Sequence, residues 1–192
     1  AKDVILDGFQ IKYADYGIYV TGASSGCEIK NCVIKPCFFG VWIDGRSSGS
    51  AAPIDTVPNG ISVHNNEISI DRMQDTSTKN HADNIWHMNK SHLLKTGSQD
   101  KVGINIIQTA GNHHIYDNWI HDTGVGIGSG VNLHPSLSVL YDGNIEINHN
   151  LIENTYQDGL GLGRNLANSR WHHNVLNNVL QFGRFHDIHS GP

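Results

Sequence analysis

The chain has 192 residues, of which 38% are hydrophobic and 16% charged, and its formal net charge is −5 at pH 7. This composition is too apolar for a disordered chain, and without a basic stripe it predicts no nucleic-acid partner. No run of about 18 apolar residues occurs, so we expect no membrane span. With 21 glycines and many asparagines, the sequence favours short strands and tight turns over helices.

A six-residue phrase recurs along the chain with the pattern apolar, two polar, Asn, any residue, apolar. Two weaker copies come first, at residues 6–11 and 29–34, and have Phe9 and Cys32 in the place of Asn. Four clear copies follow at residues 63–68, 115–120, 147–152 and 171–176. The shortest spacings between copies, 23 and 24 residues, indicate the length of the basic unit, or rung. A repeat of this length predicts a stacked, solenoid-like architecture.

A second apolar segment follows most copies of the phrase and is often opened by Gly. In chain order these segments are residues 17–20, 40–43, 103–106, 126–127 and 159–162, with a less clearly registered one at 180–182. Apolar and polar residues alternate with period two in both kinds of segment, which indicates strands. Asn tolerates the left-handed backbone conformation of a sharp turn, so we expect the Asn of each phrase at a corner between strands.

One rung therefore reads as strand, tight turn, strand, bend, strand and loop. Strands of this length are too short for stable isolated hairpins, whereas stacked rungs pair every strand in parallel and bury one apolar column. Residues 83–86 resemble a rung strand too, which leaves the register of the third rung, over residues 69–107, open. Cys27, Cys32 and Cys37 are five residues apart and are interpreted as small core residues rather than metal ligands.

The recurring phrase resembles the repeat of the right-handed parallel β-helix, or pectate-lyase-like, superfamily, in which Asn residues of successive rungs stack into an internal ladder. The resemblance covers nearly the whole chain. It implies one all-β domain over residues 1–192, a right-handed parallel β-helix of about six rungs with loop insertions bordering one face. The implied ladder consists of Asn66, Asn118, Asn150 and Asn174.

Three segments interrupt the basic rung, at residues 46–59, 69–102 and 129–142, and all border the sheet formed by the Gly-opened strands. Outward strand residues and insertions carry function in a solenoid, so we expect a substrate groove along this sheet. Exposed aromatic rings there would stack on sugars, or would only stabilise the sheet as a cross-rung pair. Alternation directs four candidate substrate-binding residues outward: Tyr19, Trp42, Asp44 and Asn105.

Five candidate catalytic residues border the same expected groove: His121, Asp122, Asp158, Arg164 and Arg184. Removing the proton beside a uronate carboxylate requires a base and a cation that stabilises the developing charge. The resemblance implies an Arg or Lys base with calcium held by carboxylates, so calcium is the cofactor to consider, although no dense Asp cluster is visible. Each residue also has a structural alternative, since Asp158 and Gly159 form a common turn dipeptide.

The sequence thus predicts a carbohydrate-active protein, a polysaccharide lyase-like enzyme or part of one, acting on an acidic polysaccharide. The alternative is a structural or adhesive segment of the fibre, tail-spike or passenger type that binds glycans without cutting them. Neither end shows a cap, so we expect a segment of a longer solenoid, or end-to-end self-association into an oligomer or filament. We expect an extracellular or cell-surface location, although the supplied chain has no signal-peptide pattern.

Overall fold

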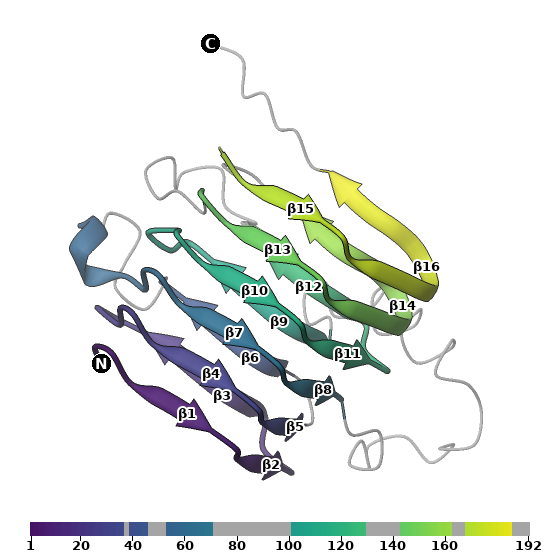
Figure 1. Cartoon of the computed structure of the whole chain (residues 1–192), viewed down its shortest axis with the longest axis horizontal. Coiled ribbons are helices and arrows are strands. Elements are labelled where there is room, and N and C mark those ends of the chain that lie inside the picture. Colours follow the sequence, from purple (N-terminus) through teal and green to yellow (C-terminus); the bar gives the residue numbers. More distant parts are fainter. Residues whose placement is uncertain (37–38, 46–52, 71–100, 130–142, 163–167, 186–192) are drawn as a thin grey trace, which may run out of the picture.

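The structure is a computed structural model that describes residues 1–36, 39–45, 53–70, 101–129, 143–162 and 168–185. Within these ranges the chain is all-β, with strands β1 to β16 and one short 3-10 helix, η2 (Ile54–Thr56). The strands lie rung upon rung in a parallel stack (Figure 1). No helix in these ranges is long and apolar enough to cross a membrane.

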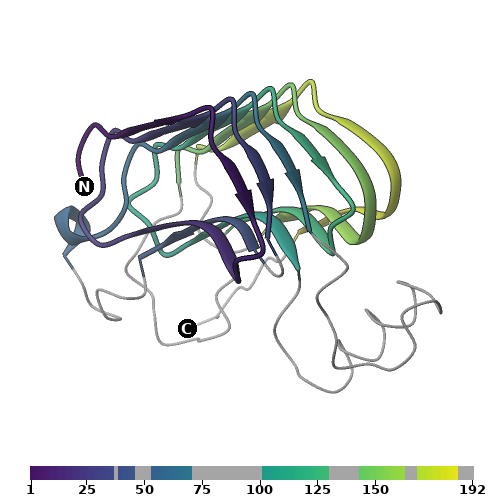
Figure 2. The ribbon, with the colours of Figure 1, turned by 90° about the horizontal axis from the view of Figure 1, so that it is seen from below.

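Each rung contributes three strand segments in turn. The first strands pair in parallel into a six-stranded sheet: β1 (Ile5–Asp7), β4 (Glu28–Lys30), β7 (Ser62–His64), β10 (His114–Tyr116), β13 (Glu146–Asn148) and β15 (Arg170–His172). Seen from below, successive rungs lie side by side along one axis (Figure 2).

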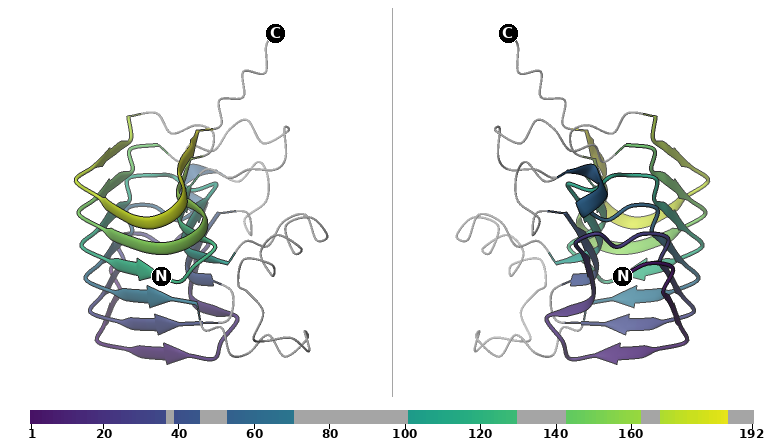
Figure 3. Two further views of the ribbon diagram at one scale, coloured as in Figure 1. Left: turned by 90° about the vertical axis from the view of Figure 1, so that its right-hand side faces the viewer. Right: turned by 90° about the vertical axis from the view of Figure 1, so that its left-hand side faces the viewer.

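The second and third segments of the rungs belong to one ten-stranded sheet that bends around the stack (Figure 3). Two long strands, β14 (Leu151–Leu162) and β16 (Val175–Phe185), run through the bend and supply both segments of their rungs. The remaining second strands are β2 (Gln10–Lys12), β5 (Val33–Lys35), β8 (Glu67–Ser69) and β11 (Trp119–His121). The remaining third strands are β3 (Tyr16–Thr21), β6 (Phe39–Asp44), β9 (Val102–Ile107) and β12 (Val125–Ser129).

The strand register confirms the predicted repeat. Backbone pairing places the first residues of all six phrases opposite one another. The third rung is also settled, because β7 pairs with β4 and β10 while β9 pairs with β6 and β12. The competing segment at residues 83–86 lies outside the described residues. The uncertain strand at 180–182 lies within β16.

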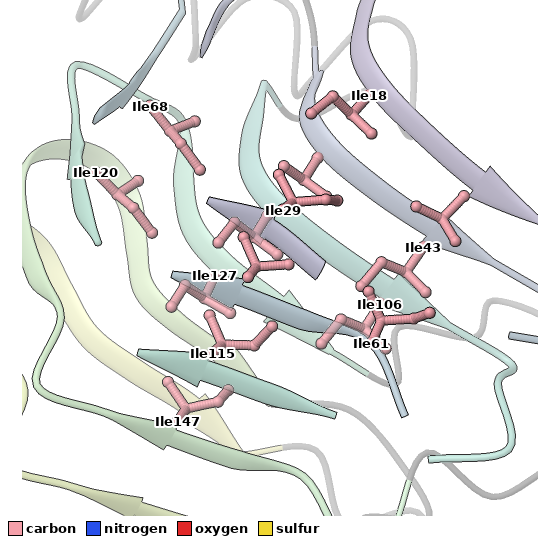
Figure 4. Packing of buried hydrophobic residues seen from close by; sticks show 14 of the residues in the cluster. Ile18, Ile29, Ile43, Ile61, Ile68, Ile106, Ile115, Ile120, Ile127 and Ile147 are labelled. Carbon is pink, nitrogen blue, oxygen red and sulfur yellow. The ribbon is translucent and has the colours of Figure 1, made fainter. Parts of the chain in front are cut away.

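One apolar column fills the inside of the stack. The inward residue of each short strand is Ile or Val in the inner rungs, and many are fully buried (Figure 4). Burying such a side chain stabilises the fold by about 1.5–3 kcal/mol. The predicted alternation of inward and outward residues is therefore confirmed, most completely in the middle rungs, where these residues are labelled in the figure: Ile68, Ile106, Ile115, Ile120 and Ile127.

The predicted Asn ladder forms along the corner between first and second strands. The side-chain amide of Asn66 donates to Oδ1 of Asn118 at 3.0 Å, Asn118 donates to Asn150 at 2.9 Å, and Asn150 donates to Asn174 at 3.0 Å. The sequence led us to expect a left-handed conformation at the ladder Asn itself. The left-handed residue is instead the one before it, with φ between 53° and 56° in the four clear phrases. That turn directs the following Asn side chain inward, where it is buried in the inner rungs.

A column of five glycines explains why Gly opens the third strands. A Cβ atom on each would come closer than 3.0 Å to an inward side chain of the next rung, and on four of them also closer than 3.0 Å to the next carbonyl oxygen. Only a residue without a side chain permits this approach between neighbouring backbones. The column consists of Gly17, Gly40, Gly103, Gly126 and Gly159.

Candidate functional site

The candidate substrate-binding residues lie together on the outer face of the third strands. Backbone pairing sets Tyr19 of β3 opposite Trp42 of β6, and Trp42 opposite Asn105 of β9. Asp44 lies two residues after Trp42 on the same strand and also points outward. Alternation therefore predicted the direction of all four side chains correctly.

Three of these four residues are nevertheless buried, and for Trp42 this corrects the expectation of an exposed ring. Tyr19 is 47% exposed, whereas Trp42, Asp44 and Asn105 are between 4% and 8% exposed. Trp42 belongs to a second apolar cluster outside the main core, together with residues of β6, β9 and β12. Alternation reports which way a side chain points, but it carries no information about what packs over the sheet.

Four aromatic rings of β3 and β6 form one connected cluster, which we call the tyrosine platform: Tyr16, Tyr19, Phe39 and Trp42. The ring centroid of Tyr16 lies 5.4 Å from Tyr19, 5.1 Å from Phe39 and 5.6 Å from Trp42. Phe39 and Trp42 meet edge to face at 4.0 Å. Phe39 and Trp42 are buried, while Tyr16 and Tyr19 remain about half exposed, so two supported rings face solvent.

Asp44 fixes the orientation of two of these rings. Its Oδ2 atom accepts a hydrogen bond from the Tyr19 hydroxyl at 3.1 Å and one from the Trp42 indole N–H at 2.9 Å. Hydrogen bonds to a charged acceptor are the stronger kind. In this structure Trp42 and Asp44 therefore hold the Tyr19 ring in place. Of the four candidate substrate-binding residues, Tyr19 is the one that solvent reaches.

Sequence reasoning missed Tyr16, although a signal for it exists. The residue before each of the first four column glycines occupies one register position, with Tyr16 opposite Phe39, Phe39 opposite Val102 and Val102 opposite Val125. These residues face outward together. The predicted strand starts at Gly17 and therefore omits the apolar residue before the glycine, although the dipeptide of an apolar residue and Gly recurs along the chain.

His121 and Asp122 lie at the corner after the second strand β11. The imidazole Nδ1 of His121 is 2.9 Å from Oδ2 of Asp122, and its Nε2 is 3.5 Å from Oε1 of Glu67. Asp122 has φ of 57°, which its short polar side chain tolerates. Only the contact with Asp122 is a hydrogen bond, because Nε2 of His121 is buried without a hydrogen-bond partner.

Charged and aromatic neighbours complete the surroundings of His121. Lys35 pairs with Glu67 at 2.7 Å, and this hydrogen bond lowers the pKa of the Glu67 carboxyl. Trp119 stacks on His121 with centroids 4.2 Å apart, and its indole N–H donates to Glu153 at 3.0 Å. His121 is thus oriented by the hydrogen bond at Nδ1 and by the Trp119 ring stacked on its face.

Two further predicted catalytic residues, Asp158 and Arg184, are not brought to this corner. Asp158 is buried on the third-strand part of β14, where its backbone lies opposite Gln181 of β16. Arg184 lies in β16 with its backbone opposite Gly161. Arg164 lies outside the described residues. Of the five candidates, the structure therefore shows only His121 and Asp122 as a joined pair.

Across the described part of the chain, no group of three or more His, Cys, Asp and Glu residues is arranged to hold a metal ion. Cys27 and Cys32 are free and buried, and the backbone N–H of Cys32 donates to Oδ1 of Asn66 in the ladder. This placement agrees with their interpretation as core residues, while Cys37 lies outside the described residues.

No protein-family model, no curated protein and no solved structure matches this chain. Its function is therefore argued from the geometry of its own side chains.

Proposed function

We propose that this chain is a carbohydrate-active parallel β-helix of the right-handed, pectate-lyase-like kind, and that it binds an acidic polysaccharide at the tyrosine platform. The observation that carries the proposal is the pair of exposed rings, Tyr16 at 44% and Tyr19 at 47%, on a buried aromatic base. A protein that meets such a polymer works outside the cell, so we also propose an extracellular or cell-surface location.

The platform has the properties that sugar recognition requires. A sugar ring presents apolar C–H groups on its face and hydroxyl groups at its edge. An exposed Tyr ring offers an apolar face and a polar tip in the same side chain. Because Phe39, Trp42 and Asp44 already hold the rings, little side-chain freedom is lost on binding, which favours affinity.

Binding is tested by titrating the protein with a panel of acidic and neutral polysaccharides in a calorimeter. We expect Tyr16→Ala and Tyr19→Ala each to weaken binding about tenfold, equivalent to about 1.4 kcal/mol. Tyr19→Phe keeps the ring and loses the hydrogen bond to Asp44, so its effect should be smaller. Tyr13→Ala is the matched control, because Tyr13 is also exposed on the first rung but outside the platform.

Two results would contradict the binding proposal. One is the absence of binding to every glycan in the panel. The other is unchanged affinity in both Tyr→Ala variants, which would make the rings a structural pair only. Weakening by Tyr13→Ala to the same degree would assign the effect to general loss of exposed aromatic surface.

Polysaccharide lyase activity is the second candidate function, and the His121–Asp122 pair favours it. A His held by a carboxylate is a common form of general acid or base. The test is to follow the ultraviolet absorbance of unsaturated uronides during incubation with acidic polysaccharides, with and without calcium. We expect Asp122→Asn to reduce the rate if the pair carries the chemistry. Binding without product would leave the adhesive alternative.

A further inference from the structure

Trp119 lies on the outer face of the second strands, whereas the tyrosine platform lies on the third strands. Its side chain is 43% exposed although two neighbours hold it. The ring stacks on His121 with the centroids 4.2 Å apart and the planes 27° apart, and the indole N–H donates to Oε2 of Glu153 at 3.0 Å. The orientation of the indole is therefore fixed while a large part of its surface reaches solvent.

Trp119 belongs to an apolar strip that crosses three neighbouring strands. Backbone pairing sets Trp119 of β11 opposite Leu151 of β14, and Leu151 opposite Val175 of β16. The next residues in the first two of these strands, Ile120 and Ile152, are fully buried in the core, so alternation directs the strip outward. Adjacent strands are about 4.8 Å apart, so the strip extends for about 10 Å along the stack.

A row of hydrogen-bonding side chains accompanies this strip. Glu153 accepts hydrogen bonds from Trp119 and, at 3.0 Å, from the side-chain amide of Asn177. The bond from Asn177, followed by the bond from Trp119, lowers the pKa of the Glu153 carboxyl, which is therefore ionised at neutral pH. Asn154 and Asn178 continue the row and are joined by a hydrogen bond of 2.8 Å. An apolar strip beside oriented polar groups matches a sugar chain, whose rings have apolar faces and hydroxyl edges.

The charges near Trp119 disfavour an acidic sugar. Three carboxylates flank the indole ring and the imidazole on which it stacks: Glu67, Asp122 and Glu153. The ammonium group of Lys35 pairs with Glu67 at 2.7 Å, so the formal charges of these four groups sum to −2. Like charges brought close together repel a wrong partner. A sugar hydroxyl, by contrast, can donate to a carboxylate, and hydrogen bonds to a charged acceptor are the stronger kind.

We propose that Trp119 and the apolar strip beside it bind a neutral glycan, at a second site separate from the tyrosine platform. One sugar ring stacks on the exposed indole surface, and the chain continues over Leu151 and Val175. Hydroxyl groups at its edge donate to Glu153. The site rests on the proposed function in one respect, that the chain is carbohydrate-active, and it differs in the ligand, which carries no carboxylate.

Calorimetric titration with linear hexasaccharides tests the site. Cellohexaose, laminarihexaose and xylohexaose are neutral, and hexagalacturonate is acidic. We expect a neutral hexasaccharide to bind the wild-type chain, and Trp119→Ala to weaken that binding about tenfold because it removes the stacking surface. Leu151→Asn keeps the indole and should weaken the same binding about threefold. Tyr19→Ala is the matched control, because it removes an exposed ring of the tyrosine platform and should leave this affinity unchanged.

Three results would overturn the neutral-glycan site: no binding of any of the three neutral hexasaccharides, unchanged affinity in Trp119→Ala, or binding of hexagalacturonate that Trp119→Ala weakens. Binding of hexagalacturonate alone would reject the second site and leave the proposed function standing. Binding of a neutral hexasaccharide alone, through Trp119, would support the second site and reject the acidic ligand of the platform. Circular dichroism of each variant checks that the strands are retained.

Discussion

Two buried corners of the stack solve the same hydrogen-bonding problem in different ways. At the ladder corner, the backbone N–H of each buried residue donates to a side chain of the next rung, as Asn66 does to Oδ1 of Asn118 at 3.1 Å. At the opposite corner, before the first strands, Ile61 donates to Nδ1 of His113 at 3.0 Å and Ile145 donates to Oγ of Ser169 at 3.1 Å. In both corners the buried residue follows a left-handed one.

The difference lies in what each side chain offers its neighbours. An Asn amide accepts and donates at once, so the same residue type serves four successive rungs of the ladder corner, from Asn66 to Asn174. At the opposite corner the residue type varies from rung to rung, and the structure shows His113 and Ser169 as acceptors of the N–H of the rung before. The corresponding residues are Cys27, Ile61, His113, Ile145 and Ser169. We therefore expect the ladder corner to tolerate substitution least.

Removing one inner ladder residue should give the largest effect. Asn118→Ala leaves the backbone N–H of Asn66 without its acceptor, removes one of the two hydrogen bonds of the Asn66 amide, and removes an amide donor to the carbonyl of Val63. An unsatisfied buried group costs about 1–3 kcal/mol and a lost hydrogen bond about 1 kcal/mol, so we expect a loss of about 4 kcal/mol in the free energy of unfolding, measured in urea. Asn174→Ala, at the half-buried end of the ladder, is the control and should lose much less. Equal losses would mean that burial does not decide the effect.

Acid should weaken the opposite corner through His113. Burial lowers the pKa of His113 to about 3 from its ordinary 6.5, and its Nε2 is 2.7 Å from Oγ1 of Thr109. Below pH 6.5 the unfolded chain takes up a proton that the folded chain refuses, so stability falls as the pH falls towards 3. Between pH 6.5 and pH 4, this proton uptake lowers the free energy of unfolding by about 3 kcal/mol.

Urea unfolding of wild type and His113→Gln at several pH values isolates this contribution. The difference in unfolding free energy between the two chains should shift in favour of the variant as the pH falls. A difference that stays constant from pH 7 to pH 4 would show that His113 does not govern the acid response.

Ser169→Ala should have a moderate effect, because it removes the acceptor of one backbone N–H in a partly buried position. We expect a loss of about 1 kcal/mol. Ser169→Thr retains the hydroxyl and serves as the control. A loss as large as that of Asn118→Ala would erase the distinction between the two corners.

The exposed Asn pairs beside the opposite corner should matter least. Asn112 donates to Asn59 at 2.9 Å and Asn144 donates to Asn112 at 3.2 Å, in the same cross-rung pattern as the buried ladder but in contact with water. Asn59→Ala should change the unfolding free energy by less than about 0.5 kcal/mol. A loss above about 1 kcal/mol would show that stacking alone, without burial, stabilises the ladder.

The sequence predicts the parallel stack well because each rung repeats the same inward residues at the same positions. The register of Ile29, Val63 and Ile115 follows from the phrase alone, and so do the ladder and the directions of Tyr19 and Trp42. The repeat also contains the signal for Tyr16, in the dipeptide of an apolar residue and Gly.

Other features depend on contacts that no local pattern encodes. The burial of Trp42, Asp44 and Asn105 depends on packing over the sheet, which alternation does not report. A search for repeats does not find the role of His113, because a different residue type, Ser169, accepts the corresponding hydrogen bond in another rung. The sequence prediction places the left-handed residue one position late, at the Asn of the phrase. Asn is suited both to a left-handed turn and to the ladder, so its residue type does not distinguish the two positions.

The two corners also set different rules for how such a chain lengthens by tandem duplication. A copied rung brings its own ladder Asn, which fits above or below its parent without any change. At the opposite corner no single residue type serves every rung, since the acceptor is His113 in one rung and Ser169 in another. A copied rung finds an acceptor for its N–H there only where the next rung carries a suitable polar side chain, as His113 does for Ile61.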